Sequence, residues 1–204
     1  MRSRKALLVI DVQNDFCGGG ALEVPEGDQV VPVLNNYIEL FARSNLPVFA
    51  SRDWHPLKTR HFNTCGGLWP AHCVQNTHGA RFHPDLQLPP DTVIISSGMN
   101  PDEDGYSAFD AVDAGGTALN GLLKQRGVEE LYAGGLATDY CVKCTVLDAL
   151  KAGYAVTLLT DAVRGVDVTA GDAQKAVDEM VRCGAGTVAF ERFLKDFSQQ
   201  KTGA

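Results

Sequence analysis

Short aliphatic runs alternate with longer segments of helical periodicity along this chain, and this alternation constrains the fold most. Lys5–Val12 (KALLVIDV) is a nearly continuous aliphatic run, as expected of a strand buried on both faces. Similar short apolar runs predict strands at Leu46–Ser51, Thr92–Ser96, Glu130–Gly135, Tyr154–Thr160 and Thr187–Phe190. Apolar residues at helical spacing predict helices at Asp28–Ser44, Gly116–Arg126, Asp139–Ala152 and Thr169–Cys183.

The order strand, crossover helix, strand is typical of an α/β fold. We expect a three-layer sandwich in which a mostly parallel six-stranded sheet is covered by helices on both faces. The 204 residues contain no repeat or linker, which predicts one domain over residues 1–204. Asp53–Pro90 departs from the rhythm, because it is rich in His, Pro, Cys and Gly and has no long apolar periodicity. Loops of this length are usually functional, so we interpret it as a metal-binding and substrate-binding insertion.

The net charge, the first residues and the cysteine content limit which binding partners and which cellular location we expect. The net charge of −7 disfavours nucleic acid and anionic membranes as partners, because both reward a basic surface. The first residues, Met1 to Lys5, are basic, but the apolar run that follows is too short for a signal peptide, which predicts a cytoplasmic protein. Six cysteines in such a chain are expected to be reduced thiols rather than disulfides.

Reactive side chains follow four of the predicted strands. In open parallel sheets, ligands bind at the carboxyl ends of the strands. The first strand delivers Asp11 to this edge, the second delivers Asp53 and His55, the third delivers Ser97, and the fourth runs into Cys141. A carboxylate, metal-type ligands and a thiol are therefore expected to converge.

Cys141 is the candidate nucleophile, because it lies in the first turn of a predicted helix with Thr138 or Asp139 as its N-cap. Unpaired N–H groups and the helix dipole would lower the pKa of the thiol, and Asp11 is the candidate base. The alternatives are a small buried hydrophobe or a redox pair with Cys144 in the CxxC pattern. The redox alternative leaves the acidic and histidine residues unexplained.

Asp53, His55, His61 and His72 form a candidate metal site with oxygen and nitrogen ligands. Such a set suits one divalent ion, Zn, Fe or Mn, and leaves positions open for water. His78 and His83 come later in the loop, and we interpret both as lying outside the site.

Five segments together resemble the nicotinamidase/pyrazinamidase branch of the isochorismatase-like cysteine hydrolases. They are LLVIDVQNDFCGGGAL from Leu7, SRDWH from Ser51, WPAHCVQNTHGARFHP from Trp69, DGYSAF from Asp104 and GGLATDYCV from Gly134. The likeness covers nearly the whole chain in the expected order. It implies a metal-dependent amidohydrolase that converts nicotinamide to nicotinate and ammonia, with a place in NAD salvage and some self-association into a homo-oligomer.

The resemblance also implies roles for individual residues. Asp11 would take the proton of Cys141, the thiolate would attack the carboxamide carbon, and a metal-activated water would hydrolyse the resulting thioester. Backbone N–H groups of Ala137 and Cys141 would hold the oxyanion, and a cis peptide is expected at Leu136–Ala137. The implied metal ligands are Asp53, His55, His72 and, as the fourth, His61, and the implied ring walls are Phe16, Trp69 and Tyr106.

One position departs from the family pattern. Ser97 stands where the family has a catalytic lysine, in Ser96-Ser97-Gly98 ahead of DGYSAF. A serine hydroxyl donates a hydrogen bond but supplies no positive charge. Lys143 follows Cys141 by two residues on the helix and is expected to face elsewhere.

The serine leaves three explanations open: an engineered change, a divergence to another small amide or ureide, or a loss of activity. The corresponding hypotheses are a nicotinamidase, a hydrolase of another small amide, and a ligand-binding pseudoenzyme.

Overall fold

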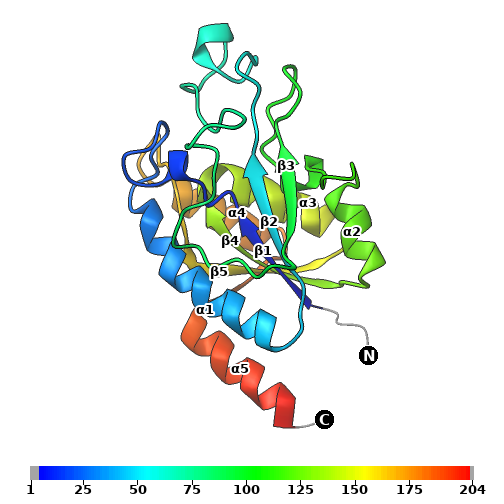
Figure 1. Ribbon diagram of the computed structural model, residues 1–204. Coiled ribbons are helices and arrows are strands. Elements are labelled where there is room, and N and C mark those ends of the chain that lie inside the picture. The colour runs from blue at the N-terminus through cyan, green and yellow to red at the C-terminus, as the bar shows by residue number, and fades with distance from the viewer. Residues whose placement is uncertain (1–4, 203–204) are drawn as a thin grey trace.

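The computed structural model describes residues 5–202, so the basic residues before Lys5 lie outside the described part. Six strands form one parallel sheet in the order β3-β2-β1-β4-β5-β6 (Figure 1). The strands are β1 Lys5–Ile10, β2 Val48–Asp53, β3 Val93–Ser97, β4 Glu130–Leu136, β5 Ala155–Arg164 and β6 Gly186–Val188. The helices are α1 Val30–Arg43, α2 Leu119–Gln125, α3 Lys143–Lys151, α4 Asp172–Arg182 and α5 Phe190–Thr202. This architecture confirms the predicted three-layer α/β sandwich.

Strand β1 packs against both helical layers. Its alternate residues Leu7 and Val9 join the apolar cluster formed with α1 and α5. Leu8 and Ile10 point to the opposite face and join the cluster formed with α2, α3 and α4. A strand with apolar side chains on both faces belongs in the middle of such a sheet, and β1 pairs with β2 on one side and β4 on the other.

The predicted helix at Gly116–Arg126 begins too early. Gly116 has a φ of 79°, and Thr117 donates its N–H to the Asp113 carboxylate at 2.7 Å, so these residues form a turn instead. Helix α2 therefore starts at Leu119.

The predicted strand at Thr187–Phe190 is wrong at its C-terminal end, because Phe190 belongs to a helix. The last strand ends at Val188, and Phe190 begins α5 with its N–H bonded to the Asp161 carboxylate at 2.8 Å. Phe190, Phe193 and Phe197 recur at helical spacing, and this stripe is the signal that indicates α5.

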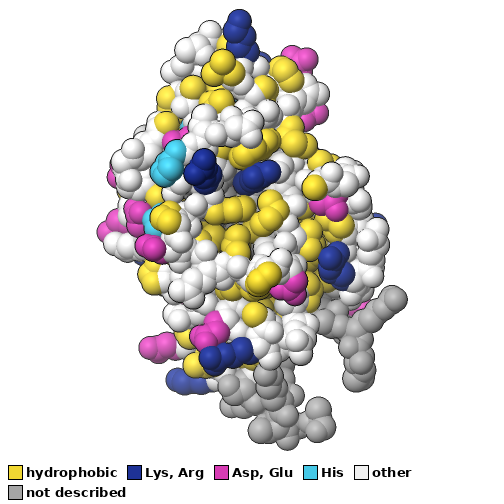
Figure 2. Space-filling model, viewed as in Figure 1, with side chains coloured by type: hydrophobic (Ala, Val, Ile, Leu, Met, Phe, Trp, Pro, Cys, Tyr) yellow, Lys and Arg dark blue, Asp and Glu magenta, His cyan; other side chains and the backbone are white. Residues whose placement is uncertain are grey.

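Residues after β2 rise above the carboxyl edge of the sheet as a loop with one short 3-10 turn, Asn63–Cys65 (Figure 1). This protruding part displays hydrophobic side chains in Figure 2, and Leu57 and Leu68 belong to it, with exposed fractions of 74% and 70%. Among the described residues, no helix is long and apolar enough to span a bilayer.

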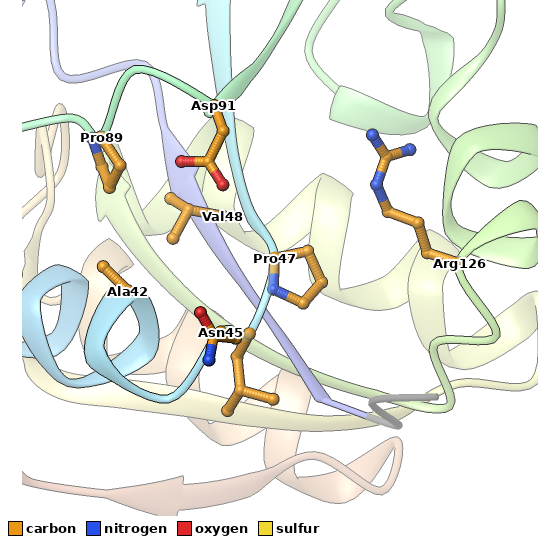
Figure 3. Close-up of a pocket in the computed structure, with 8 residues that line it drawn as sticks. Ala42, Asn45, Pro47, Val48, Pro89, Asp91 and Arg126 are labelled. Carbon is orange, nitrogen blue, oxygen red and sulfur yellow. The ribbon is translucent and has the colours of Figure 1, made fainter. Parts of the chain in front are cut away.

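A hollow lies at the amino edge of the sheet, where residues that precede three strands meet. Asn45 and Pro47 come before β2, Asp91 before β3 and Arg126 before β4 (Figure 3). It is separate from the residues at the carboxyl edge, and neither Asp91 nor Arg126 is buried.

Phe193 fixes α5 to α1 and the sheet through ring contacts with Phe41 and Tyr132, whose centroids lie 5.9 and 5.0 Å away. Its side chain is 3% exposed. We expect Phe193→Ala to lower the free energy of unfolding by about 3–5 kcal/mol, because truncating a buried ring leaves a cavity. Urea unfolding followed by circular dichroism measures this loss. Lys195→Ala, at an exposed position of the same helix, is the control, and equal stability of the two variants would contradict the packing described.

Candidate active site

Asp11 and Cys141 meet at the carboxyl edge of the sheet. Asp11 directly follows β1, and Cys141 follows its neighbour β4. One ligand atom each from Asp11, Asp53 and Cys141 lies within 4.8 Å of the others. All three side chains are buried. The structure therefore places the predicted nucleophile and base beside each other.

Ser51 holds the Asp11 carboxylate from the adjacent strand. Its hydroxyl donates to Asp11 Oδ1 at 2.7 Å, and its side chain is 1% exposed. The sequence analysis did not single out this serine. Its position two residues before Asp53 on the same strand was the available signal, because residues two apart on a strand share a face.

Cys141 lies in a π-helical turn, Thr138–Val142, that leads into α3. The Leu136–Ala137 peptide before the turn is cis, as the family resemblance implied. The predicted capping is wrong, because Ala137 occupies the N-cap and no side chain caps the turn. The Asp139 carboxylate instead accepts the N–H groups of Val166 and Asp167, at 2.9 and 2.8 Å.

The pKa values of Asp11 and Cys141 differ from those expected for a thiol at the start of a helix. Burial raises the pKa of the Cys141 thiol well above its usual value, and the Asp11 and Asp53 carboxylates raise it further. Burial and the charge of Asp53 also raise the pKa of Asp11. The predicted lowering of the thiol pKa is therefore wrong for this protein: the environment is arranged for transfer of a proton between the pair rather than for a free thiolate.

Three histidines of the loop point one ring nitrogen toward a common centre. His55 Nδ1 lies 3.1 Å from Gly98 O, His72 Nδ1 lies 2.8 Å from Pro70 O, and His61 Nδ1 lies 3.1 Å from Asp104 Oδ1. Carbonyl oxygens only accept hydrogen bonds, so the Nδ1 atoms of His55 and His72 carry the proton and Nε2 presents a lone pair. One ligand atom from each ring lies within 4.8 Å of the other two.

The arrangement around Asp53 fits a bound cation. Asp53 Oδ2 lies 3.5 Å from His55 Nε2 and 3.7 Å from His72 Nε2. His55 Nε2 is buried and has no hydrogen-bond partner. Acceptor atoms that face one another in a buried site are stable with a cation between them, and this donor set of imidazole nitrogens and a carboxylate suits zinc, iron or manganese. His55, His61, His72 and Asp53 thus fit the metal implied by the resemblance.

Aromatic side chains enclose the space between the pair and the histidines. Phe16, Trp69 and Tyr106, the three predicted ring walls, line one narrow cavity. Trp69 Nε1 donates to the Tyr106 hydroxyl at 2.8 Å, which fixes both rings. The cavity is also lined by Leu22, Tyr140 and Val166, which the sequence analysis did not select.

Two further polar residues support the site. Gln13 is fully buried, accepts Asp53 N–H and donates to Asp53 O, both at 2.8 Å, and so fixes the backbone of Asp53. Asp104 accepts from His61 and pairs with Arg60 at 3.3 Å. Both lie inside segments that had been recognised, DVQNDF and DGYSAF, but their roles depend on tertiary contacts.

Ser97 is buried on β3 beside Asp53, and its hydroxyl donates to Asp53 Oδ1 at 3.4 Å. Among the side chains described, those of residues 5–197, no lysine or arginine forms an ion pair with Asp11. Lys143 faces away from the cavity and pairs with Glu179 at 3.7 Å, as expected. The position that holds a lysine in the family pattern therefore contributes a neutral hydroxyl here.

Among the described residues, the side chains of the remaining histidines and cysteines do not line the cavity. His83 pairs with Asp28 at 3.3 Å, and His78 offers its carbonyl to Asn14. All six cysteines are free thiols, which agrees with the expected absence of disulfides.

Gly98 provides a test of the histidine cluster. Its φ is 65°, and a Cβ added there would lie 2.6 Å from His55 Nδ1. We expect Gly98→Ala to displace His55 and to weaken zinc binding by about tenfold or more, because groups that orient a ligand control metal affinity. Competition with a chromophoric chelator measures the affinity. Gly116→Ala is the control, because its φ is 79° and a Cβ there meets nothing within 4 Å. Equal zinc affinity in both variants would show that His55 is not a ligand.

Comparison with known proteins agrees with this geometry. The isochorismatase domain model matches residues 5–191. The nicotinamidase of Escherichia coli is 44% identical over 89% of this chain and 92% of its own length. The nicotinamidase/pyrazinamidase of Mycobacterium tuberculosis is 38% identical over 86% of this chain and 94% of its own. A zinc complex of Pyrococcus horikoshii pyrazinamidase superposes with a TM-score of 0.85 at 46% identity, covering 92% of this chain and all of that one. The chain belongs to the isochorismatase family, within its nicotinamidase/pyrazinamidase branch.

Proposed function

We propose that this protein is a metal-dependent cysteine amidohydrolase that converts nicotinamide to nicotinate and ammonia. One observation carries the proposal: Cys141, with Asp11 beside it, lines the same aromatic cavity as His61 and His72 of the histidine cluster. A nucleophile with its base is thereby combined with a ligand set and walls suited to a flat ring. Relatives named as nicotinamidases and a zinc-bound pyrazinamidase support the substrate and the metal.

In the proposed reaction, Asp11 accepts the proton of Cys141 while the sulfur adds to the carboxamide carbon. The N–H groups of Ala137 and Cys141 donate to the oxyanion. The proton returns from Asp11 to the departing nitrogen, and ammonia leaves behind a thioester. Asp11 then takes a proton from a water molecule that attacks the thioester carbon, and the cysteine leaves as a thiol while nicotinate is released.

Asp53, His55, His61 and His72 would hold one divalent ion, for which zinc is the first candidate. When bound, this ion supplies Lewis acidity toward the pyridine nitrogen and water. We also propose that residues 1–204 form one domain with the 53–90 loop as its binding insertion. Reduced cysteines fit a cytoplasmic location.

Ser97 is the feature that we propose limits the rate. On β3 the neutral Ser97 hydroxyl bonds to Asp53, so the negative charge that develops beside Asp11 receives no positive charge from this strand. Loss of a preorganised charge commonly costs a few kcal/mol of transition-state stabilisation, about a hundredfold or more in rate.

Ammonia release from nicotinamide tests both proposals. We expect the zinc-loaded chain to release ammonia, Cys141→Ala to release none, and Ser97→Lys to raise kcat/KM by about a hundredfold. Ser97→Met is the matched control, because methionine fills about the same space as lysine but carries no charge. We expect it to give no such gain in kcat/KM. If neither the unmodified chain nor Ser97→Lys hydrolyses nicotinamide with zinc bound, the substrate assignment is wrong.

Ser97 also favours two alternatives. A panel of small amides and ureides tests whether the chain has diverged to another substrate. Rapid alkylation of Cys141 by iodoacetamide near neutral pH would exclude a pseudoenzyme, because it reports an activated thiolate.

A further inference from the structure

The lining of the cavity includes a residue that no motif covers. Val166 lines the cavity together with Cys141 and the aromatic rings, and it lies just after the end of β5 at Arg164. Its side chain is partly buried, whereas Val168, two residues later, is 65% exposed. Val166 is therefore the part of the 165–168 segment that faces the ligand space.

A carboxylate next to the nucleophile holds Val166 in place. Asp139 lies two residues before Cys141 and is buried. Its Oδ1 accepts Val166 N–H at 2.9 Å, and its Oδ2 accepts Asp167 N–H at 2.8 Å. Hydrogen bonds to a buried charged acceptor are strong, and two bonds to consecutive N–H groups fix the orientation of the segment as well as its distance.

A third contact prevents the segment from moving away from Cys141. Asp167 has a φ of 52°, a conformation that Asp tolerates better than most residues, and its carboxylate accepts Ala173 N–H at 2.7 Å, beside the start of α4. Gly165, the residue before Val166, lies close to the same carboxylate: a Cβ added at Gly165 would lie 3.2 Å from Asp139 Oδ1. The segment is thus tied both to the turn that carries Cys141 and to α4.

We propose that Val166 is a specificity-determining residue, held by the positioning residue Asp139, which limits the size of the ring that can lie against Cys141. The ligand class is an unsubstituted six-membered heteroaromatic carboxamide. This inference rests on the proposed function, since it takes the ligand to be a pyridine carboxamide, and it adds the element that excludes substituted rings. A fixed wall discriminates more sharply than a mobile one, because a packed segment does not shift to admit one extra methyl group.

The test compares binding of nicotinamide and its four ring-methylated isomers to the zinc-loaded Cys141→Ala protein, which binds without turnover. We expect Val166→Ala to improve the affinity of at least one methylated isomer relative to nicotinamide by about tenfold, the effect of one methyl group in an apolar pocket. Val166→Leu is expected to shift the same ratio in the opposite direction. Val168→Ala, at the exposed neighbour, is expected to leave it unchanged.

Asp139→Asn tests the positioning role. The amide retains one acceptor oxygen but turns its NH2 group toward the second N–H, so the wall loosens without a change in its side chains. We expect this variant to lose part of the discrimination against the methylated isomers. We also expect Val166→Ala to change the affinity of a methylated isomer relative to nicotinamide less in the Asp139→Asn protein than in the protein that keeps Asp139. Additive effects would show that Asp139 does not act through Val166.

The outcomes separate this inference from the proposed function. If Val166→Ala and Val166→Leu do not change the affinity of any methylated isomer relative to nicotinamide, the inference is overturned even when nicotinamide is hydrolysed. If the ratio shifts as expected but no ammonia is released by the unmodified chain or by Ser97→Lys, the inference stands and the proposed reaction falls. If neither nicotinamide nor any isomer binds, both are wrong.

Discussion

The parallel pairing of β1 with β2 and β4 is the constraint on which the rest of the site depends. Ile10 is in register with Ser51 on one side and with Gly135 on the other. This register delivers Asp11, Asp53 and Cys141 to the same edge with ligand atoms within 4.8 Å of one another, although they are far apart in the sequence. A one-residue slip of β1 would move each of its side chains to the other face of the sheet and would shift Asp11 away from its partners, so packing and active-site geometry are fixed together.

The fold and the reactive residues followed from the sequence to different extents. Aliphatic runs and helical periodicity were sufficient for the six strands and for α1, α3 and α4, because both patterns report burial directly. The C-terminal α5 was missed, since Phe190 was assigned to the preceding strand. Asp11, Cys141 and the histidines were accessible because they directly follow strands or gather in one loop.

What the sequence did not reveal depends on contacts between distant segments. Ser51 matters through its bond to Asp11, Gln13 through its bonds to Asp53, and Asp139 through its bonds to Val166 and Asp167. The pKa of Cys141 was also predicted in the wrong direction, because burial and the neighbouring carboxylates, which raise it, depend on the tertiary structure. Ser97 could be located from the sequence, but the absence of an ion pair on Asp11 required the structure.

The metal centre that we propose lies on the loop and β2, beside the thiol, and does not include the thiol. The alternative is chemically reasonable, because Asp11, Asp53 and Cys141 also bring potential ligand atoms within 4.8 Å of one another. X-ray absorption spectroscopy of the zinc-loaded chain decides between the two most directly. The account predicts only nitrogen and oxygen neighbours, with the multiple-scattering signature of three imidazoles. A sulfur neighbour at about 2.3 Å would place the ion on Cys141 and contradict it.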